Sequence, residues 1–86
     1  MVNNLSQGEL LQLFGIVVAI GKSEHYSISF DYDTEWNGVD LRLWYSDNKR
    51  DINLVEACTK PSSFVTILEI IKRWTKIIVE DRGEQP

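Results

Sequence analysis

The chain contains one cysteine, one histidine and two prolines, and these small numbers exclude several kinds of site. The single cysteine, Cys58, excludes an internal disulfide and a multi-cysteine metal centre. Because His25 is the only histidine and lies in a polar segment, a serine or cysteine nucleophile has little prospect of an imidazole base. The sequence therefore predicts no catalytic residue, no resident metal and no cofactor.

Glycine-rich loops and long hydrophobic runs are also missing. The five glycines are scattered along the chain, so no phosphate-binding loop is formed. The apolar run Leu10–Ile20 has about half the length that spans a bilayer, and no basic segment precedes it. The run Asp31–Glu35 begins like a calcium loop, but Trp36 stands where that loop requires glycine. We expect a soluble cytoplasmic protein without a membrane segment.

The charge is acidic and unevenly distributed. The net charge is −4, which does not favour non-specific binding to nucleic acid or to an anionic membrane. Seven acidic and three basic residues lie between positions 31 and 56, whereas the last third of the chain is nearly neutral. The acidity therefore belongs to the segments that we predict as strands.

A first helix is predicted between Ser6 and Gly21. Ser6 and Glu9 form a capping-box pattern at its start, and Gly21 is a natural stop. Apolar residues cover most of the helix circumference, and the remaining stripe carries no charge. This helix is therefore expected either to be covered by the sheet and a second helix or to pack against a second copy of the chain. The candidate homodimer interface is Gly8, Gln12, Gly15 and Ala19.

Asn37-Gly38 predicts a two-residue type I′ turn between strands 26–35 and 39–46. One face of this hairpin is then apolar and the other is polar. In the predicted register, Asp33 faces Arg42, Asp31 faces Trp44, and Glu35 opposes Asp40. A shorter third strand is predicted over residues 51–57.

A second, amphipathic helix is predicted over residues 63–81. The chain is then a two-layer α+β domain of order α-β-β-(β)-α, with an antiparallel sheet covered on one face by two helices. We assign residues 1–82 to this single domain and residues 83–86 to a flexible C-terminal tail.

Trp44 is the strongest functional candidate, because a tryptophan in a polar surround is typical of a protein-binding hot spot. The candidate partner-binding residues are Trp44, Arg42, Asp31, Asp33, Glu35 and Asp40. They favour a non-enzymatic interaction protein whose partner is a larger protein with a basic surface. Nucleic-acid-handling proteins have such surfaces, so we expect a small inhibitor or regulator of one. The analogy, in size, charge and architecture, is with phage anti-defence proteins such as anti-CRISPRs and with immunity proteins.

Other interpretations remain open at this point. The chain can be a structural or regulatory homodimer packed through its first helix, with Trp44 covered or incidental. It can also bind nucleic acid through Lys72, Arg73 and Lys76 on the second helix, although the acidic face of the sheet would repel phosphate. Asp31 and Asp33 share one face of a strand, but solubilising surface charge accounts for them without catalysis.

Overall fold

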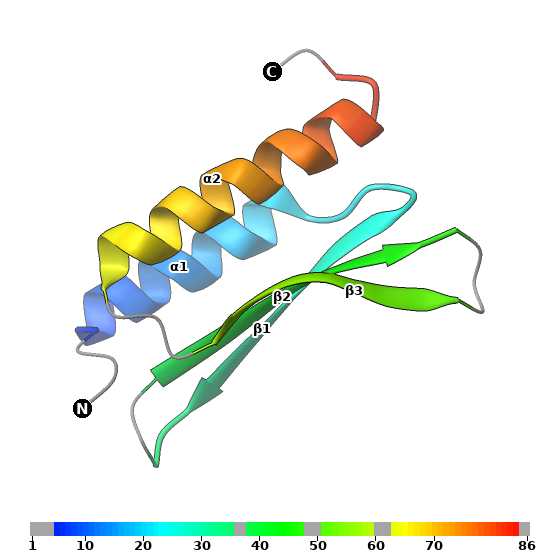
Figure 1. Cartoon of the computed structure of the whole chain (residues 1–86). Helices are drawn as coiled ribbons and strands as arrows, with labels where there is room; N and C mark the ends of the chain where they lie inside the picture. The colour runs from blue at the N-terminus through cyan, green and yellow to red at the C-terminus, as the bar shows by residue number, and fades with distance from the viewer. Residues whose placement is uncertain (1–4, 36–37, 48–50, 60–62, 85–86) are drawn as a thin grey trace.

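The computed structural model describes residues 5–35, 38–47, 51–59 and 63–84. The elements are α1 (Gln7–Ile20), β1 (Tyr26–Asp33), β2 (Gly38–Ser46), β3 (Ile52–Thr59) and α2 (Phe64–Asp81). Both helices lie on the same side of the sheet, and the opposite side of the sheet is open (Figure 1). The predicted two-layer α+β architecture is therefore confirmed.

The sheet is an antiparallel meander in which β2 is the central strand, between β1 and β3. Alternate residues of β2, namely Val39, Leu41 and Leu43, are fully buried beneath the helices. Because side chains alternate along a strand, the intervening residues of β2 point to the open face. The third strand, predicted over residues 51–57, is confirmed with slightly later bounds.

The register of the hairpin differs from the predicted one. Asp33 pairs with Gly38, so four residues connect β1 to β2, and Gly38 belongs to the strand rather than to a two-residue turn. Asn37, the other residue of the predicted turn, lies outside the described residues. Asp33 ends β1 because its Oδ1 accepts a hydrogen bond from the Glu35 N–H at 2.8 Å, which bends the chain there. The pairing moves by an even number of residues, so the two faces of the hairpin keep their predicted composition.

A β-bulge in β3 changes which of its residues face the helices. Leu43 pairs with Glu56, but the next residue of β2, Trp44, pairs with Leu54, so Val55 is the additional residue. Side chains alternate along a strand, and one extra residue reverses the alternation. Before the bulge, Ile52 and Leu54 therefore lie on the open face; after it, Glu56 and Cys58 lie toward the helices.

Helix α1 begins with the predicted capping box. The Ser6 Oγ accepts from the Glu9 N–H at 3.1 Å, and the Glu9 carboxylate accepts from the Ser6 N–H at 2.9 Å. At the other end, Gly21 adopts φ 69° and its N–H donates to the Val17 carbonyl at 3.2 Å. Arg82 then joins the two helices, because its guanidinium donates to the carbonyls of Ile20 and Lys22.

Helix α2 begins at its N-cap, Ser63, and buries one stripe against the sheet. The fully or almost fully buried residues of this stripe are Ile67, Ile71, Trp74 and Ile78. After α2, Gly83 adopts φ 81°, and the N–H groups of Gly83 and Glu84 donate to the carbonyls of Glu80 and Val79. This pattern is a Schellman motif, and it satisfies the last carbonyl groups of the helix.

Helix α1 is less covered than we predicted for a central helix that lies between the sheet and the second helix. All of its residues are described, and Leu13 is the one that is buried. Helix α2 lies beside α1 in the same layer rather than over it (Figure 1). The arrangement therefore leaves the outer side of α1, which carries no charge, exposed to solvent.

An ion pair ties the loop before β1 to the end of α2. The His25 Nδ1 lies 2.9 Å from the Asp81 Oδ1, and the His25 N–H donates to the Asp81 Oδ2 at 3.2 Å. Asp81, and to a lesser extent Glu24 and Asp47, raises the pKa of His25 above its ordinary 6.5. The hydrogen bond from His25 lowers the pKa of Asp81 below 3.8. The pair therefore strengthens when His25 is protonated.

We predict that the melting temperature falls as the pH rises above 6.5. Because the pKa of His25 is raised in the folded state, its interaction with Asp81 stabilises the fold fully below pH 6.5. This stabilisation is lost as the pH rises through the folded-state pKa of His25. The contribution of Asp81 is present above 3.8 and is lost as the pH falls through its lowered pKa. Thermal melting at pH values from below 3.8 to above 6.5 measures both losses. In His25→Gln the alkaline decline should disappear, and an identical decline in both proteins would contradict the assignment to His25.

Candidate functional site

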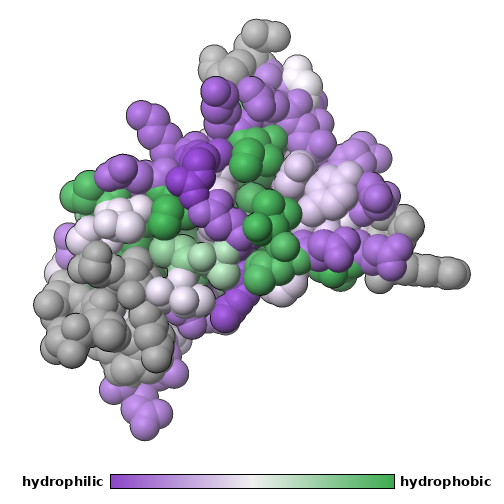
Figure 2. Space-filling model, in the orientation of Figure 1, coloured by the Kyte–Doolittle hydropathy of each residue, from purple (hydrophilic) through white to green (hydrophobic). Residues whose placement is uncertain are grey.

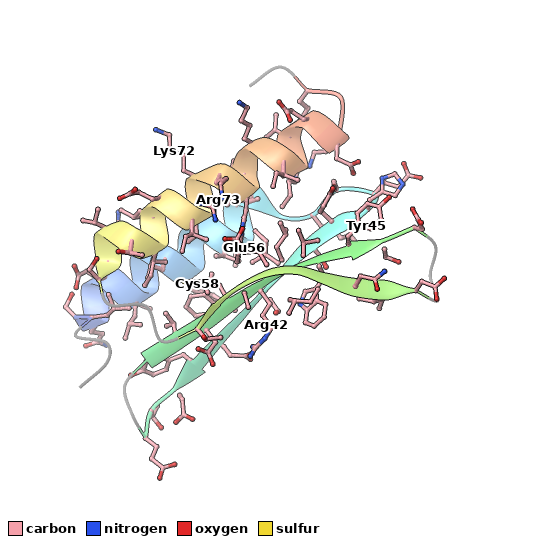
Figure 3. The ribbon with its side chains drawn as sticks, in the orientation of Figure 1. Arg42, Tyr45, Glu56, Cys58, Lys72 and Arg73 are labelled. Carbon is pink, nitrogen blue, oxygen red and sulfur yellow. The ribbon has the colours of Figure 1, made fainter. Side chains whose placement is uncertain are left out.

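The open face of the sheet is formed around Arg42 and Trp44 of the central strand. Figure 3 shows Arg42 on the side of the sheet that faces away from the helices. Both side chains are half-buried, because neighbours on β1 and β3 flank them. The structure thus brings together two of the predicted partner-binding residues on a surface that no helix covers.

The predicted acidic residues Asp31 and Asp40 are directly opposed across β1 and β2. The corrected register places them there, whereas the predicted register placed Asp31 opposite Trp44. Arg42 faces Ser29 rather than Asp33, and its Nη1 lies 3.6 Å from the Asp31 Oδ2. The predicted pair of Asp33 with Arg42 is therefore wrong. The two opposed carboxylates repel each other, and the Arg42 side chain lies beside Asp31.

Asp33 and Glu35 lie at the end of the sheet rather than at the centre of its open face. Asp33 is the last residue of β1, and Glu35 follows it in the connection to β2. Both are exposed. They extend the acidic surface toward one end of the hairpin but are separated from Trp44 along the strands.

Trp44 is held in place by its neighbours on both sides. Its Nε1–H donates to the Ser29 Oγ at 3.0 Å, and Leu54 of β3 is its pairing partner. Ile52, two residues before Leu54, pairs with Ser46 on the same face. Ile52 is 63% exposed and Leu54 is 50% exposed. We call Trp44, Ile52 and Leu54 the open-face patch.

Ile52 and Leu54 were absent from the predicted site. Their alternation with polar residues predicted a strand, and apolar residues of such a strand normally face the core. The bulge at Val55 reverses that expectation by placing both on the open face. A weak signal was present, because the charged Glu56 stands in the same alternation as Ile52, Leu54 and Cys58, but sequence alone does not locate a bulge.

One of the three basic residues of α2 that were considered for nucleic-acid binding, Arg73, is paired with a carboxylate of the sheet. Arg73 and Glu56 point toward one another in Figure 3 and form an ion pair, whereas Lys72 points away from the sheet. The Glu56 Oε1 also accepts from the Trp74 Nε1–H at 2.8 Å. Arg73 thus helps to neutralise a carboxylate between sheet and helix.

In Figure 2, hydrophilic side chains dominate the outer edge of the molecule and hydrophobic surface gathers toward its middle.

The predicted dimer stripe is exposed along the whole of α1. Gly8, Gln12, Gly15 and Ala19 are joined on this surface by three larger apolar side chains: Leu11, Phe14 and Val18 are 64%, 54% and 62% exposed. We call these seven residues the α1 face. Beside it, a groove of about 640 Å³ lies between α1 and β1 and includes Leu10, Phe30 and Tyr32 in its lining.

Gly8 and Gly15 make no close packing contact with the part of the chain that the structure describes. Among the described residues, nothing lies within 4 Å of a Cβ added at Gly15, and at Gly8 such an atom meets only the Ser6 Oγ at 4.0 Å. A glycine inside a helix costs roughly 0.5–1 kcal/mol relative to alanine. The packing of the described chain does not account for that cost.

Other chemistry is sparse in the described part of the chain. No group of three or more His, Cys, Asp or Glu side chains there could hold a metal ion. No helix that the structure describes is long and apolar enough to cross a membrane. Cys58 is 6% exposed, and burial raises the pKa of its thiol, which disfavours the reactive thiolate.

The fold and the site together define a small two-layer α+β domain with an uncovered sheet face centred on Trp44. Comparison with protein-family models, curated proteins and solved structures finds no match for this chain.

Proposed function

We propose that the protein is a non-enzymatic interaction module that binds a larger protein through the open face of its sheet. The observation that carries this proposal is the open-face patch: a tryptophan and two aliphatic side chains lie together on a surface that the helices do not cover. An apolar centre with an aromatic anchor and a polar rim is the usual composition of a protein–protein interface.

The rim of this surface favours a basic partner. Asp31 and Asp40 oppose one another across the strands, and the Arg42 Nη1 lies 3.6 Å from the Asp31 Oδ2. A lysine or arginine supplied by a partner would relieve the repulsion between the two carboxylates and would gain a charge-assisted hydrogen bond. Asp33 and Glu35 would steer such a partner from a distance.

The partner that we propose is a nucleic-acid-handling protein, with the present chain as its inhibitor or regulator. Proteins that bind DNA or RNA present basic surfaces to phosphate groups. A small acidic domain that occupies such a surface would compete with nucleic acid. Phage anti-defence proteins, such as anti-CRISPRs, and immunity proteins supply the functional analogy.

The open-face patch is testable with two kinds of substitution. We predict that Trp44→Ala weakens partner binding by at least about 30-fold, the loss typical of a hot-spot residue. Because Trp44 is half-buried, the melting temperature of the Trp44→Ala variant has to be measured together with its affinity for the partner. Leu54→Lys and Leu54→Glu provide an independent pair at an exposed position. If the partner is basic, Leu54→Lys should bind more weakly than Leu54→Glu.

The measurement is affinity capture followed by titration with the partner identified by mass spectrometry. Val65→Lys is the matched control, because Val65 is 62% exposed on α2, away from the patch. The wild type should reduce nucleic-acid binding by the captured partner, and Trp44→Ala should not. A partner retained equally by Trp44→Ala, Leu54→Lys and Val65→Lys would refute the proposed site. A partner with an acidic surface would refute the proposed class.

A further inference from the structure

We infer that the α1 face is the contact surface for a second copy of the chain, with the two α1 helices packed against each other. Leu11, Phe14 and Val18 are each more than half exposed. They follow one another at helical spacing, so they form a continuous apolar row on one side of the helix. The inference is independent of the function proposed for the sheet.

The two glycines are the second observation. A helix-interior glycine disfavours the helix, and no described atom outside the helix's own backbone lies within 4 Å of a Cβ added at Gly15. Closely packed helices require small residues where they touch, because the distance between their axes depends on the side chains at the contact. Gly8 and Gly15 are separated by two helical turns, so both would lie along the same contact.

Charge favours a second copy as the occupant. The chain has a net charge of −4, yet the α1 face contains no charged residue. Two copies can therefore meet through a twofold axis without opposing like charges. The face offers a foreign protein no ionic group by which it could be recognised, whereas an identical face is complementary in its apolar character.

The available area is sufficient for a small dimer interface. Covering the exposed parts of the α1 face and adjoining Tyr32 on both copies would remove roughly 1,000 Å² from water, the lower end for a specific interface. The groove beside the face is bordered by Leu11 and Phe14. An apolar side chain from the second copy, such as its Phe14, would enter this groove and add to the buried area.

The dimer would leave the sheet accessible. The helices form one layer of the molecule, and the open face of the sheet lies on the other side (Figure 1). A dimer through α1 would therefore present two open-face patches. Loss of dimerisation and loss of partner binding can then be measured separately.

Gly15→Leu tests the inference by sedimentation equilibrium. We expect a dimeric wild type and a Gly15→Leu variant whose dimer dissociation constant is raised by at least about 30-fold. The far-UV spectrum should be unchanged, because a side chain at Gly15 has open space in the single chain. Glu69→Leu is the matched control, since it adds the same side chain at an exposed position of α2, and it should remain dimeric.

Cysteine cross-linking provides a second readout that does not depend on a large side chain. Because Cys58 is buried, a cysteine introduced on the surface is the reactive thiol. Gly15→Cys should form a disulfide-linked dimer on oxidation, and Glu69→Cys should not. A wild type that is monomeric at millimolar concentration would overturn the inference, even if the α1 face then captured another protein. Equal cross-linking of both variants would also overturn it.

Discussion

Trp74→Ala is expected to cause the largest loss of stability of any single substitution considered. Trp74 is fully buried, and truncation of a buried aromatic side chain to alanine costs about 3–5 kcal/mol. Domains of this size have a total free energy of unfolding of about 4–13 kcal/mol. The variant should therefore melt more than about 12 °C lower than the wild type, and part of it should populate the unfolded state at ambient temperature.

Trp74→Phe separates packing from hydrogen bonding at this position. Phenylalanine keeps an aromatic ring in the core but cannot donate to Glu56, whose carboxylate would retain Arg73. We expect Trp74→Phe to lose clearly less stability than Trp74→Ala in chemical denaturation at one protein concentration. Equal losses in the two variants would show that the ring does not fill the core in the way described.

Leu43→Ala is expected to have the second-largest effect. Leu43 is fully buried at the centre of β2, and a Leu→Ala change in such a position costs about 2–5 kcal/mol, including the cavity that remains. The measurement is the free energy of unfolding from urea denaturation, with the slope of the transition compared between variants.

Leu54→Ala is the matched control, with the same change of side chain on the adjacent strand. Leu54 is half exposed on the open face, so its truncation should cost less than about 1 kcal/mol. The comparison also tests the bulge. If β3 continued without the extra residue, Leu54 would turn toward the helices, and the two losses would be similar.

Local signals in the sequence predicted the helices well. The Ser6–Glu9 capping box is present as expected, because capping involves residues only a few positions apart. The apolar stripe of α2 was also predictable, because its residues recur at the regular spacing of a helix. The extent to which α1 is covered was not predictable in this way, since it depends on where α2 packs.

The hairpin shows the limit of a local turn signal. Asn37-Gly38 predicted a two-residue turn, but the Asp33 side chain accepts from the Glu35 N–H and ends β1 earlier. The composition of each face was nevertheless correct, because the register moved by an even number of residues. The identity of each cross-strand pair was wrong, and Asp31 rather than Asp33 lies beside Arg42.

The amino-acid sequence by itself determined the α+β class, the two helices, the strands of the hairpin and the polar character of the face that bears Trp44. These features follow from capping, helical periodicity and strand alternation, which act over a few residues. Only the tertiary structure decided that Ile52 and Leu54 join Trp44 and that one side of α1 remains uncovered. A one-residue bulge reverses every side chain before it, and the packing of two helices depends on residues far apart in the chain.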